Sequence, residues 1–127
     1  SGFTLFYGLL LGLLTVAAFQ NSDRIKEGIL SEATTLGVLY ADMNSYPEPI
    51  RSDVKFMMRD YVLFTIYRDW PAHRAGGALN GGYNRADAIR RELARFEPQS
   101  AREKIIHAEV IASSQQFSSA RQLRLAG

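Results

Sequence analysis

The chain has 127 residues, which fits one domain, and it contains no cysteine. The absence of cysteine excludes a disulfide framework and a cysteine-based metal site. Its 15 lysines and arginines exceed its 13 acidic residues by too little to predict nucleic-acid binding, and every charged residue lies after residue 22.

The first segment of the chain is a charge-free apolar run from Gly2 to Phe19. A helix of about 20 apolar residues crosses a hydrocarbon core of about 30 Å. No basic residue precedes the run, which disfavours a secretory signal peptide, whereas a buried helix of a water-soluble domain stays an alternative. We therefore predict a transmembrane helix over residues 1–20 and a helical extramembrane domain over residues 21–127.

Gly8 and Gly12 form a G-x-x-x-G pair inside this run. Two glycines four residues apart share one helix face and allow a neighbouring helix to approach closely. The pair predicts helix packing within the membrane, although glycine is common in membrane helices and a chance pair is the alternative.

Apolar residues then recur at helical spacing in an amphipathic stripe: Ile25, Ile29, Ala33, Leu36, Tyr40 and Met43. No proline lies between Gly2 and Ser45, so we expect the first helix to continue unbroken to about Tyr40. Pro47 and Pro49 are expected to end this helical region.

A second stripe, Ile50 to Phe64, predicts another helix that ends near Pro71, Gly76 and Gly77. Because short connections make neighbouring helices antiparallel, we expect a hairpin with its apolar stripes in contact. The facing residues would be Leu36 and Tyr40 on one side and Val54 and Met57 on the other.

The last third of the chain predicts a glycine-rich loop and two more helices. Asn84 is a plausible N-cap for a short arginine-rich helix that ends before Pro98. Ser100 and Glu103 form a capping box that opens the final helix. No period-two run long enough for a strand occurs anywhere, so the predicted fold is all-α, with the span continuing into an antiparallel helical bundle.

Glu32 is the polar residue that fits its surroundings least well, because it lies beside the first apolar stripe. A carboxylate held out of water requires a partner. The Tyr61 hydroxyl, Arg121 and Arg124 are the candidates, with an arginine of the final helix favoured. The alternative is that Glu32 lies just off the stripe, in water.

The other polar residues form no pattern that is typical of a catalytic or metal site. His73 and His107 have no second ligand at metal spacing, and no nucleotide-binding or hydrolase motif is present. An arginine cluster on the short helix is either a solvated face or a contact with lipid headgroups or an acidic neighbour: Arg85, Arg90, Arg91 and Arg95. We predict no enzyme activity, no cofactor and no metal.

Five motifs in order resemble the bestrophin-like family of membrane proteins, whose function is unknown. The stretch "EATTLGVLY" is similar to the family signature and contains Glu32, Ala33, Leu36 and Tyr40. The apolar run, "YPEPIR", "RDYVLFTIYRDWP" with Trp70 and Pro71, and "ARQLRL" are similar to further family segments. One departure is Asp69, where the family more often has Glu. The resemblance implies one span before Ser1 and two after Gly127 in a complete member.

Two functions follow as expectations. The first is a membrane-anchored structural or accessory subunit that docks to a larger membrane complex and binds membrane lipids and other transmembrane helices. The alternative, implied by the resemblance, is a bestrophin-like channel or transport-related protein. Arg121 and Arg124 near the membrane favour a cytoplasmic side for residues 21–127. The expected location is therefore the bacterial inner membrane.

Overall fold

The computed structural model describes residues 2–76 and 80–126, and all regular structure in those residues is helical. The elements are α1 (Gly2–Ala18), α2 (Asp23–Asp42), the 3₁₀ turn η1 (Met43–Ser45), α3 (Ile50–Phe64), the π-helical turn η2 (Thr65–Asp69), α4 (Trp70–Arg74), α5 (Asn80–Arg95) and α6 (Ala101–Ala126). The predicted all-α class is confirmed.

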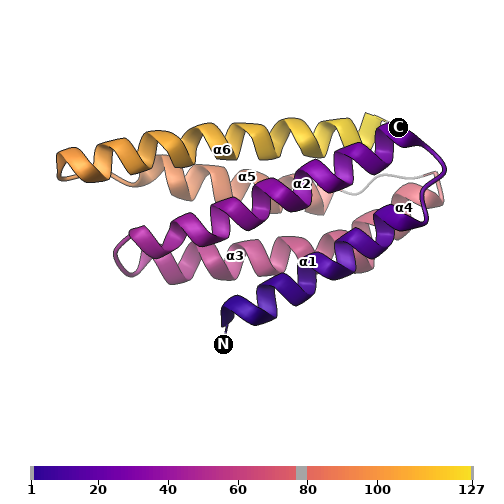
Figure 1. Cartoon of the computed structure of the whole chain (residues 1–127), viewed down its shortest axis with the longest axis horizontal. Helices are drawn as coiled ribbons and strands as arrows, with labels where there is room; N and C mark the ends of the chain where they lie inside the picture. The colour runs from indigo at the N-terminus through magenta and orange to yellow at the C-terminus, as the bar shows by residue number, and fades with distance from the viewer. Residues whose placement is uncertain (1, 77–79, 127) are drawn as a thin grey trace.

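The long helices form an elongated bundle (Figure 1). α2 packs most closely against α6 and α1, whereas α3 packs most closely against α5. α2 leads away from the end of the bundle that carries the C-terminus, and α6 returns to it, so the two are antiparallel (Figure 1). The return of the final helix along α2 agrees with the sequence-based expectation.

The predicted continuous helix from Gly2 to Tyr40 is wrong. α1 ends at Ala18, and the chain turns back so that α1 and α2 pack as a hairpin. The polar residues after Phe19 provide the reason. Ser22 takes an extended conformation, and its side chain accepts a hydrogen bond from the Ile25 amide at 3.3 Å, which caps the start of a separate helix.

The predicted transmembrane helix over residues 1–20 is also not supported. Within residues 2–76 and 80–126, no helix combines the length and apolarity needed to cross a bilayer.

The connection between α2 and α3 lies where the two prolines predict it, but the main neighbours of these helices differ from the expectation. Leu36 and Val54 are fully buried, as expected for the two stripes. The Tyr40 ring instead stacks on Phe6 of α1, with 3.9 Å between ring centroids, and the Lys55 ammonium of α3 lies 5.1 Å from its centre. α1 therefore takes part of the packing role that the sequence assigned to α3.

The helical segment that starts at Ile50 ends at Arg74, between Pro71 and Gly76 as predicted, but it contains the π-turn η2. Proline has no amide hydrogen and its ring clashes with the carbonyl four residues earlier, so a straight α-helix is disrupted one turn before it. Here the Trp70 amide donates to the Thr65 carbonyl, five residues back. The wider turn absorbs Pro71 and turns Asp69 into the bundle, where it is buried.

α5 begins at Asn80, so the expected N-cap at Asn84 is wrong, and the helix includes Gly81 and Gly82. The expected glycine-rich loop falls partly on residues 77–79, outside the described residues. A Cβ on Gly81 would clash with Phe64 Cζ, and one on Gly82 would lie 2.8 Å from Arg121 Nη2. These glycines therefore allow the start of α5 to pack against α3 and α6.

The predicted capping box opens α6. The Glu103 amide donates to Ser100 Oγ at 3.1 Å, and the Glu103 carboxylate accepts from the Gln99 amide at 2.7 Å. The partner of the carboxylate lies one residue before the N-cap, but both donors are satisfied as the motif requires.

We expect Ser100→Ala to destabilise the protein by about 1 kcal/mol, because it leaves the Glu103 amide without its side-chain acceptor. Chemical unfolding monitored by circular dichroism measures the change. Ser119→Ala is the matched control, since Ser119 is exposed in the same helix. Equal effects of the two substitutions would contradict the capping role.

Candidate functional site

A buried cluster of charged and polar side chains joins α2, α3, η2 and α6. Its members are Glu32, Tyr61, Asp69, Arg121 and Arg124. Glu32 and Tyr61 are fully buried and Arg124 is only 1 % exposed. Two carboxylates face two guanidinium groups, so the formal charges balance, as a buried cluster requires.

Glu32 and Arg124 form the centre of this cluster. Arg124 Nε lies 2.5 Å from Glu32 Oε1, and Arg124 Nη2 lies 3.5 Å from Glu32 Oε2. The Tyr61 hydroxyl donates a hydrogen bond to Glu32 Oε2. The carboxylate therefore has a cation and a neutral donor, which offset the free-energy cost of removing it from water.

Asp69 connects the two arginines. Its Oδ2 atom lies 3.3 Å from Arg124 Nη2 and 4.0 Å from Arg121 Nη2. Three buried side-chain atoms among the described residues have no hydrogen-bond partner: Thr65 Oγ1, Arg121 Nε and Arg124 Nη1. The charges are therefore paired more completely around Arg124 than around Arg121.

Arg124 stays charged and the Tyr61 hydroxyl stays neutral near neutral pH. Burial disfavours the charged guanidinium of Arg124, but the Glu32 carboxylate, with Tyr61 and Asp69, raises its pKa above the ordinary value. Burial, and then the charge of Glu32, raises the pKa of the Tyr61 hydroxyl. The arrangement suits a permanent connection between helices better than proton transfer.

The structure brings together the four residues singled out as a polar cluster, Glu32, Tyr61, Arg121 and Arg124. The alternative that Glu32 lies in water is wrong, because its side chain is fully buried. Asp69 is the member that sequence reasoning missed as a partner. The sequence feature that could have identified Asp69 is its position directly before the apolar pair Trp70-Pro71. Only the π-turn, however, places its side chain inside the bundle.

The remaining motif residues are mainly part of the core. Ala33, Leu36 and Tyr40 are buried on α2, and Trp70 is buried next to Asp69, whereas Pro71 is exposed. The motif "EATTLGVLY" therefore combines one cluster residue with core packing.

The two glycines of α1 have different surroundings. A Cβ on Gly12 would lie 3.2 Å from Ile66 Cδ1 of η2, whereas a Cβ on Gly8 would meet nothing within 4 Å. Gly12 thus packs inside the chain. A packing role for Gly8 against another helix stays a prediction.

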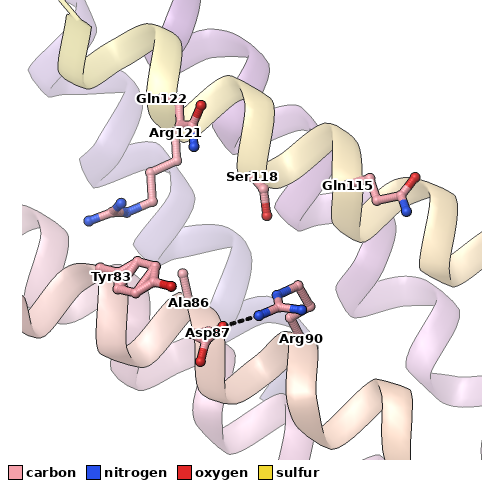
Figure 2. A pocket seen from close by; sticks show the side chains of 8 residues that line it. All are labelled: Tyr83, Ala86, Asp87, Arg90, Gln115, Ser118, Arg121 and Gln122. Carbon is pink, nitrogen blue, oxygen red and sulfur yellow. Dashed lines mark hydrogen bonds and ion pairs between the residues drawn. The ribbon is translucent and has the colours of Figure 1, made fainter.

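A second feature is a hollow of about 350 Å³ between α5 and α6 (Figure 2). Tyr83, Asp87 and Arg90 line it from α5, and Ser118 and Arg121 line it from α6. Arg121 therefore belongs both to the wall of this hollow and to the buried cluster. Asn84, the predicted N-cap residue, does not line this hollow. The side chain of His73 is not among those that the structure describes.

The chain matches a known protein family, and this match agrees with the sequence motifs whose residues form the buried cluster and the core. The family model described as a bestrophin-like domain matches residues 1–127. The chain belongs to the bestrophin-like family. No curated protein and no solved structure matches it. In this bestrophin-like domain, the buried cluster therefore involves three of the five family segments: Glu32 of the signature, Tyr61 and Asp69 of the segment that continues from α3 into η2, and Arg121 and Arg124 of the final segment.

The surroundings of His107 predict that the stability of the folded bestrophin-like domain depends on pH. Its Nδ1 lies 2.8 Å from the Tyr46 hydroxyl, and burial lowers its pKa from the ordinary 6.5. The folded state therefore binds a proton less readily than the unfolded chain. The stability that neutral His107 contributes is fully present above pH 6.5 and is lost as the pH falls from 6.5 through the lower pKa of the folded state. Asp42 acts in the opposite direction, because burial and Glu109 raise its pKa.

We expect the free energy of unfolding to fall less between about pH 7 and about pH 5 in His107→Gln than in the wild type. Comparing the two proteins removes the contribution of Asp42, which is present in both. Identical pH profiles would show that the pKa of His107 is the same in the folded and unfolded states.

Proposed function

We propose that this bestrophin-like domain is a membrane-associated structural module whose α1–α2 face docks an apolar helix of the same protein or of a larger membrane complex. The observation that carries the proposal is the outer face of α1. Leu5 is 57 % exposed and Leu11 is 63 % exposed, although the helix contains no charge. A helix that is apolar on every side normally has all its faces covered.

The shape of this face supports a helix as the occupant. Two overlapping hollows of about 320 and 260 Å³ lie between α1 and α2, and together they form the groove of this face. Tyr7, Leu10 and Leu14 line them from α1, while α2 contributes mainly small residues, including Ala33 and Gly37. Small residues allow close helix approach, and hydrophobic walls suit an apolar helix.

Site-specific cross-linking in the native membrane tests this proposal. Residues 1–127 contain no cysteine, so Val38→Cys in the full-length protein, with any cysteine outside these residues replaced by serine, attaches one photoreactive group at the rim of the groove. Ile105→Cys is the control, because Ile105 is 64 % exposed but lies on α6, outside the groove. We expect a defined adduct with an apolar protein segment at position 38 only.

The same experiment separates the competing occupants. Leu11→Gln in the Val38→Cys background should reduce the protein adduct, because an amide on the groove wall must be desolvated when a helix docks. Adducts with lipid alone, or equal protein adducts at positions 38 and 105, would overturn the docking proposal.

Ion conduction or transport is the second candidate function, and the bestrophin-like family match favours it. Reconstitution of the full-length protein in planar bilayers tests it. Currents that require the protein would support conduction, and their absence in a preparation shown to be folded and inserted would leave docking as the proposed role.

A further inference from the structure

The hollow between α5 and α6 combines positive charge with neutral hydrogen-bond donors (Figure 2). Arg90 and Arg121 provide the positive groups. The neutral donors are Tyr83, Gln115, Ser118 and Gln122. This set of side chains is suited to a ligand with several acceptor oxygens.

Arg121 is the most unusual residue of this wall. It extends from α6 towards α5, beside Tyr83 (Figure 2), and only 8 % of the residue is exposed. Its Nε atom has no hydrogen-bond partner, and its nearest paired acid, Asp69, is 4.0 Å away and closer to Arg124. Arg121 therefore has donor capacity left, which a buried guanidinium ordinarily uses.

Arg90 adds a second positive group, and it shares its acidic partner with another arginine. Asp87 pairs with Arg90, but Asp87 Oδ2 also lies 2.9 Å from Arg91 Nε. One carboxylate thus serves two cations on this part of α5. Together with the incompletely paired Arg121, this leaves the hollow with surplus positive charge.

We propose that the hollow binds a phosphate group, carried either by a small free molecule or by a lipid headgroup. Phosphate offers acceptor oxygens in several directions, so donors on both helices can engage it at once, and guanidinium groups match its geometry. Arg121 approaches the ligand from the buried side and Arg90 from the exposed rim. The site goes beyond the helix-docking role and does not depend on it, because it lies on different helices.

Thiol protection in the full chain tests the site. Ser118→Cys introduces a single thiol on the wall of the hollow, and Ser119→Cys places one on the next residue, which is exposed and does not line the hollow. We expect inorganic phosphate at constant ionic strength, or vesicles containing phosphatidic acid, to slow labelling in the Ser118→Cys variant only. Protection by free phosphate without vesicles identifies a soluble ligand, and protection only by phosphatidic acid identifies a headgroup.

The arginine requirement is tested in the same background. Arg90→Gln should weaken protection about tenfold, the effect of losing one hydrogen bond to a charged group. Arg91→Gln is the matched control, since Arg91 shares Asp87 but does not line the hollow. Absence of protection by either probe, equal protection at positions 118 and 119, or equal effects of the two arginine substitutions would overturn the proposal.

Discussion

Glu32→Ala is expected to destabilise the bestrophin-like domain by about 3–5 kcal/mol, because it leaves the buried Arg124 guanidinium without its closest anion. Asp69 remains 3.3 Å from Arg124 Nη2, but Arg121 shares that carboxylate. The free energy of unfolding, measured by denaturant titration in mild detergent, gives the size of the effect.

Two further variants identify its cause. Glu27→Ala removes an exposed carboxylate from the same helix and should change stability by less than about 1 kcal/mol. Replacing both partners, Glu32→Met with Arg124→Met, should recover much of the loss, because an apolar pair leaves no unpaired charge. A loss below about 1 kcal/mol for Glu32→Ala would contradict the burial of this ion pair.

Gly28→Ala is expected to destabilise the domain by about 3 kcal/mol, at the upper end of typical overpacking effects. The new Cβ would lie 2.5 Å from the Arg124 amide nitrogen and 2.7 Å from its Cα. These are backbone atoms, so the substitution can be accommodated only if α2 and α6 move apart. That movement would also lengthen the contact between Glu32 and Arg124.

Gly8→Ala is the matched control for this prediction. Both substitutions replace glycine by alanine within a helix, but a Cβ on Gly8 meets nothing within 4 Å. Alanine there should be neutral or stabilise the protein by up to about 1 kcal/mol, because glycine is the poorer helix former. Similar stability changes for the two variants would show that the α2–α6 contact at Gly28 is not as close as described.

The elements that sequence reasoning predicted well are those with strong local signals. The apolar stripe and prolines defined α2, Ile50 to Phe64 defined α3, and Ser100 with Glu103 marked the start of α6. Ser22 also carried a local signal, as an N-cap before an apolar stripe. The expected continuous helix rested on the absence of proline alone, so the α1–α2 turn was missed.

The features that could not be predicted depend on contacts between distant segments. Asp69 and Arg124 are 55 residues apart, and no local pattern specifies that they meet. Gly81 and Gly82 were interpreted as loop residues because glycine is a poor helix former. Their place inside α5 makes sense only once Phe64 and Arg121 are known to lie against them.

The separation of Glu32 and Arg124 by 92 residues also has a consequence for biosynthesis. A ribosome produces α2, α3 and η2 before α6, so Glu32 and Asp69 exist as unmatched carboxylates in the emerging chain. Those helices cannot reach their final packing without burying both negative charges unpaired. Completion of the domain must therefore wait until Arg121 and Arg124 leave the exit tunnel, and until then the apolar sides of the early helices stay accessible to chaperones.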